Sequence, residues 1–168
     1  TFAHTYPIGL VSYNGKLIDA LYESWPGAVG GGWISGAVKI FDTFSDPEGK
    51  NPLSTRKIGG YGGIKDLAEN NSYLFSYDGK LYCVYYNEIF GALNDEEEKS
   101  IVRRDSRITS ICMHEGTVYD TNNSGKIFKT FEDLLGETPI VSLGKDYYIR
   151  HLFSHNKKLY FETENQIF

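Results

Sequence analysis

The segment LFSYDGKLYCVYYNEIF, residues 74–90, decides the fold, because the chain repeats it in outline three more times. The other copies are LVSYNGKLI at 10–18 with KIF at 39–41, ICMHEGTVYDTNNSGKIF at 111–128, and LFSHNKKLYFETENQIF at 152–168. A phrase that returns after about 40 residues is typical of repeat architectures, in which each copy is one small unit of structure.

Each copy predicts a β-hairpin followed by a further strand. The turn dipeptides are Asn14-Gly15, Asp78-Gly79, Glu115-Gly116 and Asn156-Lys157. Asn-Gly and Asp-Gly favour tight two-residue turns because both positions tolerate positive φ. The runs ending in Ile-Phe predict a third strand, and a fourth is expected at Thr55–Ile58, Ser100–Arg103 and Ile140–Leu143. Four short strands per unit are typical of a β-propeller blade.

The first strand of each unit is apolar at adjacent positions, as at Leu74-Phe75 and Leu152-Phe153. A strand with one solvated face alternates, whereas a strand apolar on both parities is expected to be covered on both faces. Blades packed face to face meet this requirement. A β-sandwich is the alternative, but it does not need a sequence period.

The phrase apolar-apolar-Ser-Tyr-Asn/Asp-Gly-Lys-Leu-Tyr…Ile-Phe resembles the blade repeats of the β-propeller superfamily, and its copies span almost the whole chain. It lacks the Trp-Asp ending of WD40 repeats and the Gly-Gly pattern of kelch repeats. The resemblance implies an all-β propeller with about four repeats of four-stranded antiparallel blades. The single domain, 1–168, would contain units at about 8–66, 67–104, 105–147 and 148–168, the last completed by an N-terminal strand. Because a fold does not fix a function, the resemblance implies no catalytic residue.

The fourth copy stops inside its third strand, which leaves three interpretations open. The chain is a four-bladed ring with one thin blade latched by residues 1–8, a piece of a larger ring, or a part-ring completed by a second copy. Open strand edges promote pairing with other chains, so a homodimer or association with further blades is an expected possibility.

Composition narrows the classes of partner. The net charge is −5 over 168 residues, so no nucleic-acid partner is expected. The sequence has no apolar run of 18 residues, so no membrane partner is expected. Arg103, Arg104 and Arg107 form the basic cluster, which is expected in a solvated loop between units; a phosphate or acidic-partner site is the alternative.

No cofactor is predicted. The segment 120–125 matches the first half of a calcium loop, but its twelfth position is Phe131, so we interpret it as a hairpin turn. His114 and His155 share a repeat position with Tyr13 and Tyr77, which indicates a structural role rather than a general base.

The first unit departs from the repeat by an insertion at 23–33, which holds both tryptophans of the chain. Loops on rigid scaffolds carry function, and exposed Trp is a frequent binding anchor. We predict a ligand-binding face formed by Trp25 and Trp33 with Tyr61, Arg103 and Arg107. The alternative is that the tryptophans fold back and cap the sheet.

The sequence therefore predicts a non-enzymatic β-propeller scaffold that binds a protein or glycan partner. Two alternatives stay open: a hydrolase or lyase with an axial polar or metal site, and a part-propeller completed by a second chain.

Overall fold

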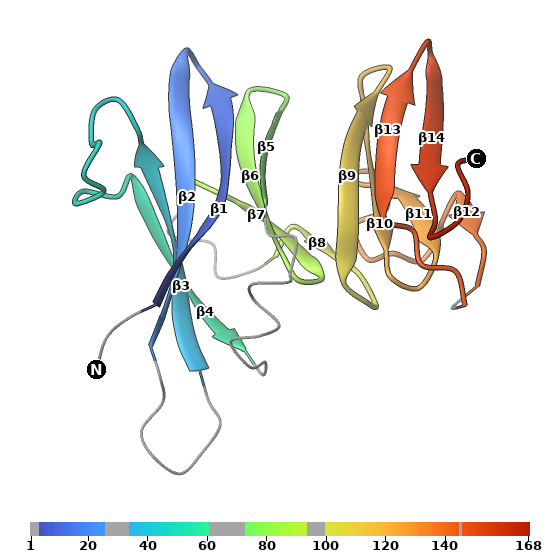
Figure 1. Ribbon diagram of the computed structural model, residues 1–168, viewed down its shortest axis with the longest axis horizontal. Coiled ribbons are helices and arrows are strands. Elements are labelled where there is room, and N and C mark those ends of the chain that lie inside the picture. Colours follow the sequence, from blue (N-terminus) through green and yellow to red (C-terminus); the bar gives the residue numbers. More distant parts are fainter. Residues whose placement is uncertain (1–3, 26–33, 61–72, 94–99, 145) are drawn as a thin grey trace. The chain divides into compact units, whose positions relative to one another are not determined.

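A computed structural model of the chain describes residues 4–25, 34–60, 73–93, 100–144 and 146–168. Within these ranges all regular secondary structure is β-strand, arranged in four antiparallel sheets (Figure 1). The all-β class predicted from the repeats is confirmed.

The strands follow the repeats in chain order. The first sheet has the order β1-β2-β3-β4, with β1 at His4–Tyr13, β2 at Lys16–Trp25, β3 at Ile34–Asp42 and β4 at Ser54–Gly60. The second has the order β5-β6-β7-β8, with β5 at Tyr73–Tyr77, β6 at Lys80–Tyr85, β7 at Glu88–Gly91 and β8 at Val102–Arg103. The third contains β9 at Ile108–His114, β10 at Thr117–Asn122, β11 at Lys126–Lys129 and β12 at Val141–Ser142. The fourth pairs β13 at His151–His155 with β14 at Lys158–Glu162.

The four predicted turns join the first two strands of each sheet. Every residue of the four turn dipeptides has positive φ, between 47° and 78°. This is the backbone of the tight hairpin turn that matches the twist of the flanking strands. The predicted fourth strands are present as β4, β8 and β12. In the last repeat the third run forms a bridge from Ile167 to Glu162 beside β14.

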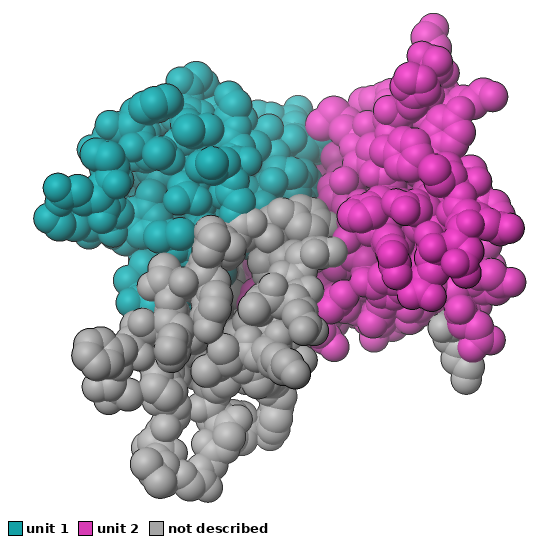
Figure 2. Space-filling model, in the orientation of Figure 1, with its two compact units in different colours: residues 1–83, 91–98 teal, residues 84–90, 99–168 magenta. Residues whose placement is uncertain are grey.

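The chain divides into two compact units (Figure 2). Unit 1 contains residues 1–83 and 91–98, and unit 2 contains residues 84–90 and 99–168. The division falls within the second sheet rather than between two repeats.

The insertion of the first unit is partly strand. The prediction placed 23–33 in a loop, but β2 continues to Trp25 and β3 begins at Ile34, with Trp25 opposite Ser35. The extra residues therefore lengthen the β2–β3 hairpin. The segment 26–33 lies outside the described residues.

Each unit has its own apolar core. In unit 1, β1 lies beside β5, and Ile18, Ile40, Phe41 and Leu74 are buried. In unit 2, β13 lies beside β9, and Ile149 and Leu152 pack in one cluster with Ile127. First strands of successive sheets are thus neighbours within both units.

Burial on both faces holds for some first strands and not for others. On β9, Ile108, Thr109 and Ser110 are buried in succession, while the apolar repeat pair Ile111-Cys112 is half-buried. The prediction is wrong for β1 and β13, because Leu10 is exposed and Leu152 is the buried residue of β13. Only one face of β13 packs on a neighbouring sheet of its unit, and the opposite face keeps its apolar side chains in contact with solvent.

Candidate ligand-binding site

Three of the five predicted binding residues cannot be assembled into a site. Trp33 and Tyr61 lie outside the described residues, and for Trp25 the structure describes only its backbone at the end of β2. The binding role assigned to these three aromatic residues stays a prediction.

Arg103 is a partly exposed member of a cross-strand ion pair. It lies opposite Glu88, the first residue of β7. Its Nε and Nη2 atoms donate to Glu88 Oε1 at 2.8 and 2.5 Å. The Arg103 side chain is 65% exposed, so it is a solvated strand residue. An exposed ion pair of this kind contributes little stability.

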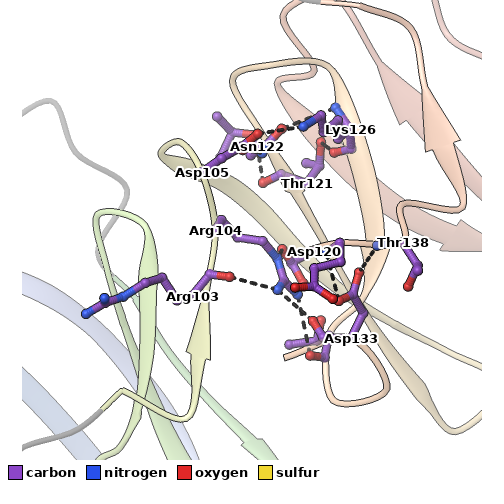
Figure 3. A network of polar contacts seen from close by, with 12 residues as sticks. Arg103, Arg104, Asp105, Asp120, Thr121, Asn122, Lys126, Asp133 and Thr138 are labelled. Carbon is purple, nitrogen blue, oxygen red and sulfur yellow. Dashed lines mark hydrogen bonds and ion pairs between the residues drawn. The ribbon is translucent and has the colours of Figure 1, made fainter. Parts of the chain in front are cut away.

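The prediction that the arginine cluster is solvated is wrong for Arg104, whose side chain is fully buried. It forms a two-pronged ion pair with Asp120 on β10 (Figure 3). Nε donates to Oδ2 at 2.7 Å and Nη2 donates to Oδ1 at 2.6 Å. This planar fork matches the guanidinium to both carboxylate oxygens, a geometry that lysine cannot provide.

The rest of the Arg104 guanidinium is also satisfied. Its Nη1 donates to the carbonyl of Asp133 at 2.7 Å, and its Cζ lies 4.4 Å from the centre of the Phe128 ring. Burial raises the pKa of the Asp120 carboxyl, and the hydrogen bonds from Arg104 act in the opposite direction. Arg104 therefore ties the segment after β8 to the third sheet, which is a structural role.

Arg107 lies next to a pocket of unit 2 and contacts one of the residues that line it. Its carbonyl accepts a hydrogen bond from the amide of Asn123 at 2.9 Å, so its backbone is held by the β10–β11 turn. Its Nη2 donates to the phenolic oxygen of Tyr148 at 2.8 Å. Arg107 thus positions a tyrosine that lines a pocket.

The pocket lies in unit 2, is open to solvent, and has a volume of about 330 Å³. This is near the lower end of the range for small-ligand sites, about 300–1,000 Å³. Two short segments supply its walls: Asp146, Tyr147 and Tyr148 before β13, and Thr163, Glu164, Asn165 and Gln166 after β14.

The first wall depends on Gly125. This residue has φ +71°, and a Cβ added to it would lie 2.6 Å from the carbonyl oxygens of both Gly144 and Tyr147. Its own carbonyl accepts a hydrogen bond from Leu143 at 3.0 Å. The β10–β11 turn must therefore end in glycine for the backbone of Gly144 and Tyr147 to lie directly against it.

The second wall is a turn closed by its own backbone. The amide of Thr163 donates to the carbonyl of Gln166 at 2.9 Å. Arg150 Nη2 donates to Glu164 Oε1 at 2.9 Å, which links the turn to the start of β13. The first wall is held by Gly125 and Arg107 of the third repeat, and the second by Arg150 at the start of β13, so the pocket is part of the folded unit.

The lining chemistry is aromatic and hydrogen-bonding. Tyr147 is 51% exposed and offers an accessible ring, while Asn165 and Gln166 carry amide groups that both donate and accept. Two carboxylates, Asp146 and Glu164, add acceptors, and the lining residues include no cationic side chain. An aromatic ring beside side chains that can donate and accept hydrogen bonds suits a ligand with many hydroxyl groups and apolar C–H faces.

Sequence reasoning missed this pocket for an identifiable reason. The prediction placed the binding face around the 23–33 insertion and treated 163–166 as part of the fourth repeat. The available signal was the run Asp146-Tyr147-Tyr148, which follows Gly144. That run has no counterpart in the repeat phrase, so the sequence does contain a signal for a role of these tyrosines outside sheet packing.

His114 and Ser154 make a contact that resembles a nucleophile and its base. His114 Nδ1 lies 2.8 Å from Ser154 Oγ, and its Nε2 lies 4.0 Å from Glu115. In unit 1 the repeat equivalent Tyr13 donates to the carbonyl of Gly79 at 2.9 Å. Since this repeat position links one sheet to the next in both units, the structure supports the structural role predicted for it.

The segment 120–125 forms the end of β10 and its hairpin turn, as predicted. Among the described residues, no group of three or more His, Cys, Asp or Glu side chains is placed to hold a metal ion. A helix able to cross a membrane is likewise not found in the part of the chain that the structure describes.

The solved structures that the chain resembles include two computationally designed proteins. No protein-family model matches the chain, and no curated protein matches it. Among solved structures, the chain is similar to the computationally designed protein Ika4, with a TM-score of 0.48 and 12% identity over 83% of this chain and 86% of that one. It is also similar to the computationally designed protein Ika8, with a TM-score of 0.49 and 10% identity; it aligns over 96% of its own length and spans 57% of that chain.

Proposed function

We propose that the protein is a non-enzymatic repeat scaffold that binds a glycan in the pocket between residues 146–148 and 163–166. The observation that carries this proposal is the exposed Tyr147 ring in a pocket that also holds two side-chain amides and two carboxylates. Sugars present flat C–H faces to aromatic rings and hydroxyl groups to amides and carboxylates, so one small pocket of this composition meets both needs.

The charge of the lining defines the class of glycan. Asp146 and Glu164 bring carboxylates to the pocket, and Arg150 pairs with Glu164 from outside the lining. A uronic or sialic acid would place a further carboxylate beside them, and like charges at short range disfavour binding. Neutral oligosaccharides are therefore the expected ligands.

The scaffold in this proposal is a β-propeller whose blades are the four sheets. Two features support it. Within each unit the first strand of one sheet lies beside the first strand of the next, as for β1 with β5 and β9 with β13. Side chains at one repeat position, Tyr13 and His114, bond to the following sheet in both units. This regular sheet-to-sheet contact is what blades around an axis require.

The test is a binding titration against neutral cello-, xylo-, malto- and chito-oligosaccharides, with oligogalacturonate as the acidic probe. We expect at least one neutral series to bind and oligogalacturonate to bind at least tenfold more weakly. Tyr147→Ala should weaken binding at least tenfold because the ring is lost, and Tyr147→Phe should retain most of it because the ring stays.

A matched control is available in Tyr86, which is 48% exposed, lies in the β6–β7 turn and is not among the residues that line the pocket. Tyr86→Ala should leave binding unchanged. If no series binds, or if Tyr147→Ala and Tyr86→Ala behave alike, the pocket is not a glycan site.

A further inference from the structure

Leu10 and Leu152 occupy the same repeat position on the first strands of the first and fourth sheets. Leu152 is 6% exposed, whereas Leu10 is 62% exposed. In unit 1 the equivalent Leu74 is also buried. The first sheet thus exposes a side chain that the same repeat position buries in two other sheets.

The fourth sheet exposes an apolar surface of the complementary kind. Phe153 on β13 is 36% exposed, and its ring stacks on Tyr160 of β14 with a centroid separation of 5.4 Å. These rings face away from the cluster that holds Leu152, because successive side chains of a strand point to opposite faces. We call this surface the Phe153–Tyr160 face.

The third and fourth sheets show what such a face packs against. Cys112 and Tyr119 are the repeat equivalents of Phe153 and Tyr160. They pack against the cluster that contains Leu152 and Ile149 of the fourth repeat. In this interface, the face that corresponds to Phe153–Tyr160 receives the leucine of the next sheet.

A polar pair sets the register of the same interface. His114 Nδ1 and Ser154 Oγ lie 2.8 Å apart. The repeat equivalents on the two uncovered surfaces are His155, on the fourth sheet, and Ser12, on the first. Both are exposed, so the apolar and the polar halves of the interface each have a complement on the chain.

We propose that the Phe153–Tyr160 face binds the first sheet of a second copy of this chain, with Leu10 against the two rings and Ser12 against His155. The contact continues the packing already present between the third and fourth sheets. It joins two different surfaces and is therefore heterologous, so each copy carries one surface of each kind. The proposal does not depend on the ligand pocket.

The test uses native mass spectrometry and light scattering on the chain between about 1 and 100 μM. We expect masses of two or more copies. Leu10→Glu removes one surface and Phe153→Glu removes the other, so each variant alone should be monomeric across this range. An equimolar mixture should form a heterodimer, because each variant keeps the surface that its partner lacks.

Recovery in the mixture also shows that both variants are folded, since an unfolded chain would not restore the contact. Phe44→Glu in unit 1 and Leu135→Glu in unit 2 replace exposed apolar residues outside both surfaces and should leave the mass unchanged. A wild-type monomer at every concentration would overturn the proposal. So would an assembly that survives both substitutions, or variants that do not form a heterodimer when mixed.

Discussion

The hairpin turns require positive φ at both central residues, and one of the four turns meets this requirement without glycine. Three of the four turns carry glycine at the second position, but the fourth carries Lys157, which has φ +59°. A side chain at such a φ places Cβ close to the following carbonyl, at a cost of roughly 1–2 kcal/mol. The fourth turn therefore forms in spite of its sequence, because the flanking strands fix it.

Replacing Lys157 with glycine should stabilise the protein by about 0.5–1 kcal/mol, the strain relieved less the entropy that glycine loses on folding. Urea denaturation measures this gain. Lys158→Gly, one residue later on β14, is the control and should destabilise, because its φ is not positive. Equal effects of the two substitutions would mean that φ at residue 157 is not the source of the strain.

The Asp42 carboxylate makes the free energy of unfolding depend on pH. The Lys16 ammonium lies 2.9 Å from this carboxylate, and together with the Ser45 hydroxyl it lowers the pKa of Asp42 to about 2. A carboxyl with a lowered pKa stabilises the folded state above its unfolded pKa of about 4, and that contribution is lost as the pH falls through 2.

Wild type should therefore exceed Asp42→Asn in stability at pH 6, and the difference should shrink between about pH 4 and pH 2. Urea midpoints at pH 6, 4 and 2.5 measure this. Lys16→Met, which removes the main partner, should reduce the pH dependence. A difference between wild type and Asp42→Asn that is constant from pH 6 to pH 2.5 would contradict the assignment.

At the scale of elements, the β10–β11 turn connects the third sheet to the ligand pocket. Gly125 ends this turn, and the segment after β12 lies against it without room for a side chain. The turn thus has two roles: it closes a hairpin, and it supports the backbone that presents Tyr147. Only the first role was predicted, because the second depends on residues about 20 positions later in the chain.

Gly125→Ala should destabilise the protein by more than the roughly 1–2 kcal/mol expected from left-handed backbone alone. It should also weaken glycan binding, because the backbone of Tyr147 must move. Gly116→Ala is the matched control. Gly116 has φ +78°, and a Cβ there would meet nothing within 4 Å, so the control measures backbone strain without the clash. If the two variants lose equal stability, the close approach of Gly125 to Gly144 and Tyr147 contributes nothing to the loss.

At the scale of the whole molecule, four repeats form two compact units whose division falls inside the second sheet. The repeat position of Leu10, Leu74 and Leu152 is apolar throughout, yet its burial differs from copy to copy. Burial at this position depends on whether another sheet packs against it. In the proposed assembly, a second copy of the chain would bury Leu10 as Leu74 and Leu152 are buried.

If only the folded chain associates, its melting temperature rises with concentration by mass action. We expect a rise of roughly 2 °C for each tenfold increase in wild-type concentration, and none for Leu10→Glu. Calorimetry at 5 and 50 μM measures this, with Phe44→Glu as the control that should behave as wild type. A wild-type melting temperature independent of concentration would argue against association.

The sequence alone determined the all-β class, the four hairpins, their turn dipeptides and the positions of β4, β8 and β12. These features depend on local rules: positive φ at Asn-Gly and Asp-Gly, and the strand preference of Val, Ile, Tyr and Phe. The tertiary structure decided that Arg104 is buried against Asp120, that Arg107 donates to Tyr148, and that 146–148 and 163–166 line one pocket. Each of these contacts joins residues that are separated along the chain. Aligning the repeats shows which positions are equivalent, but it does not show which side chains from different segments meet in space. The same reason explains why Leu10 and Leu152 look alike in the sequence and differ in burial.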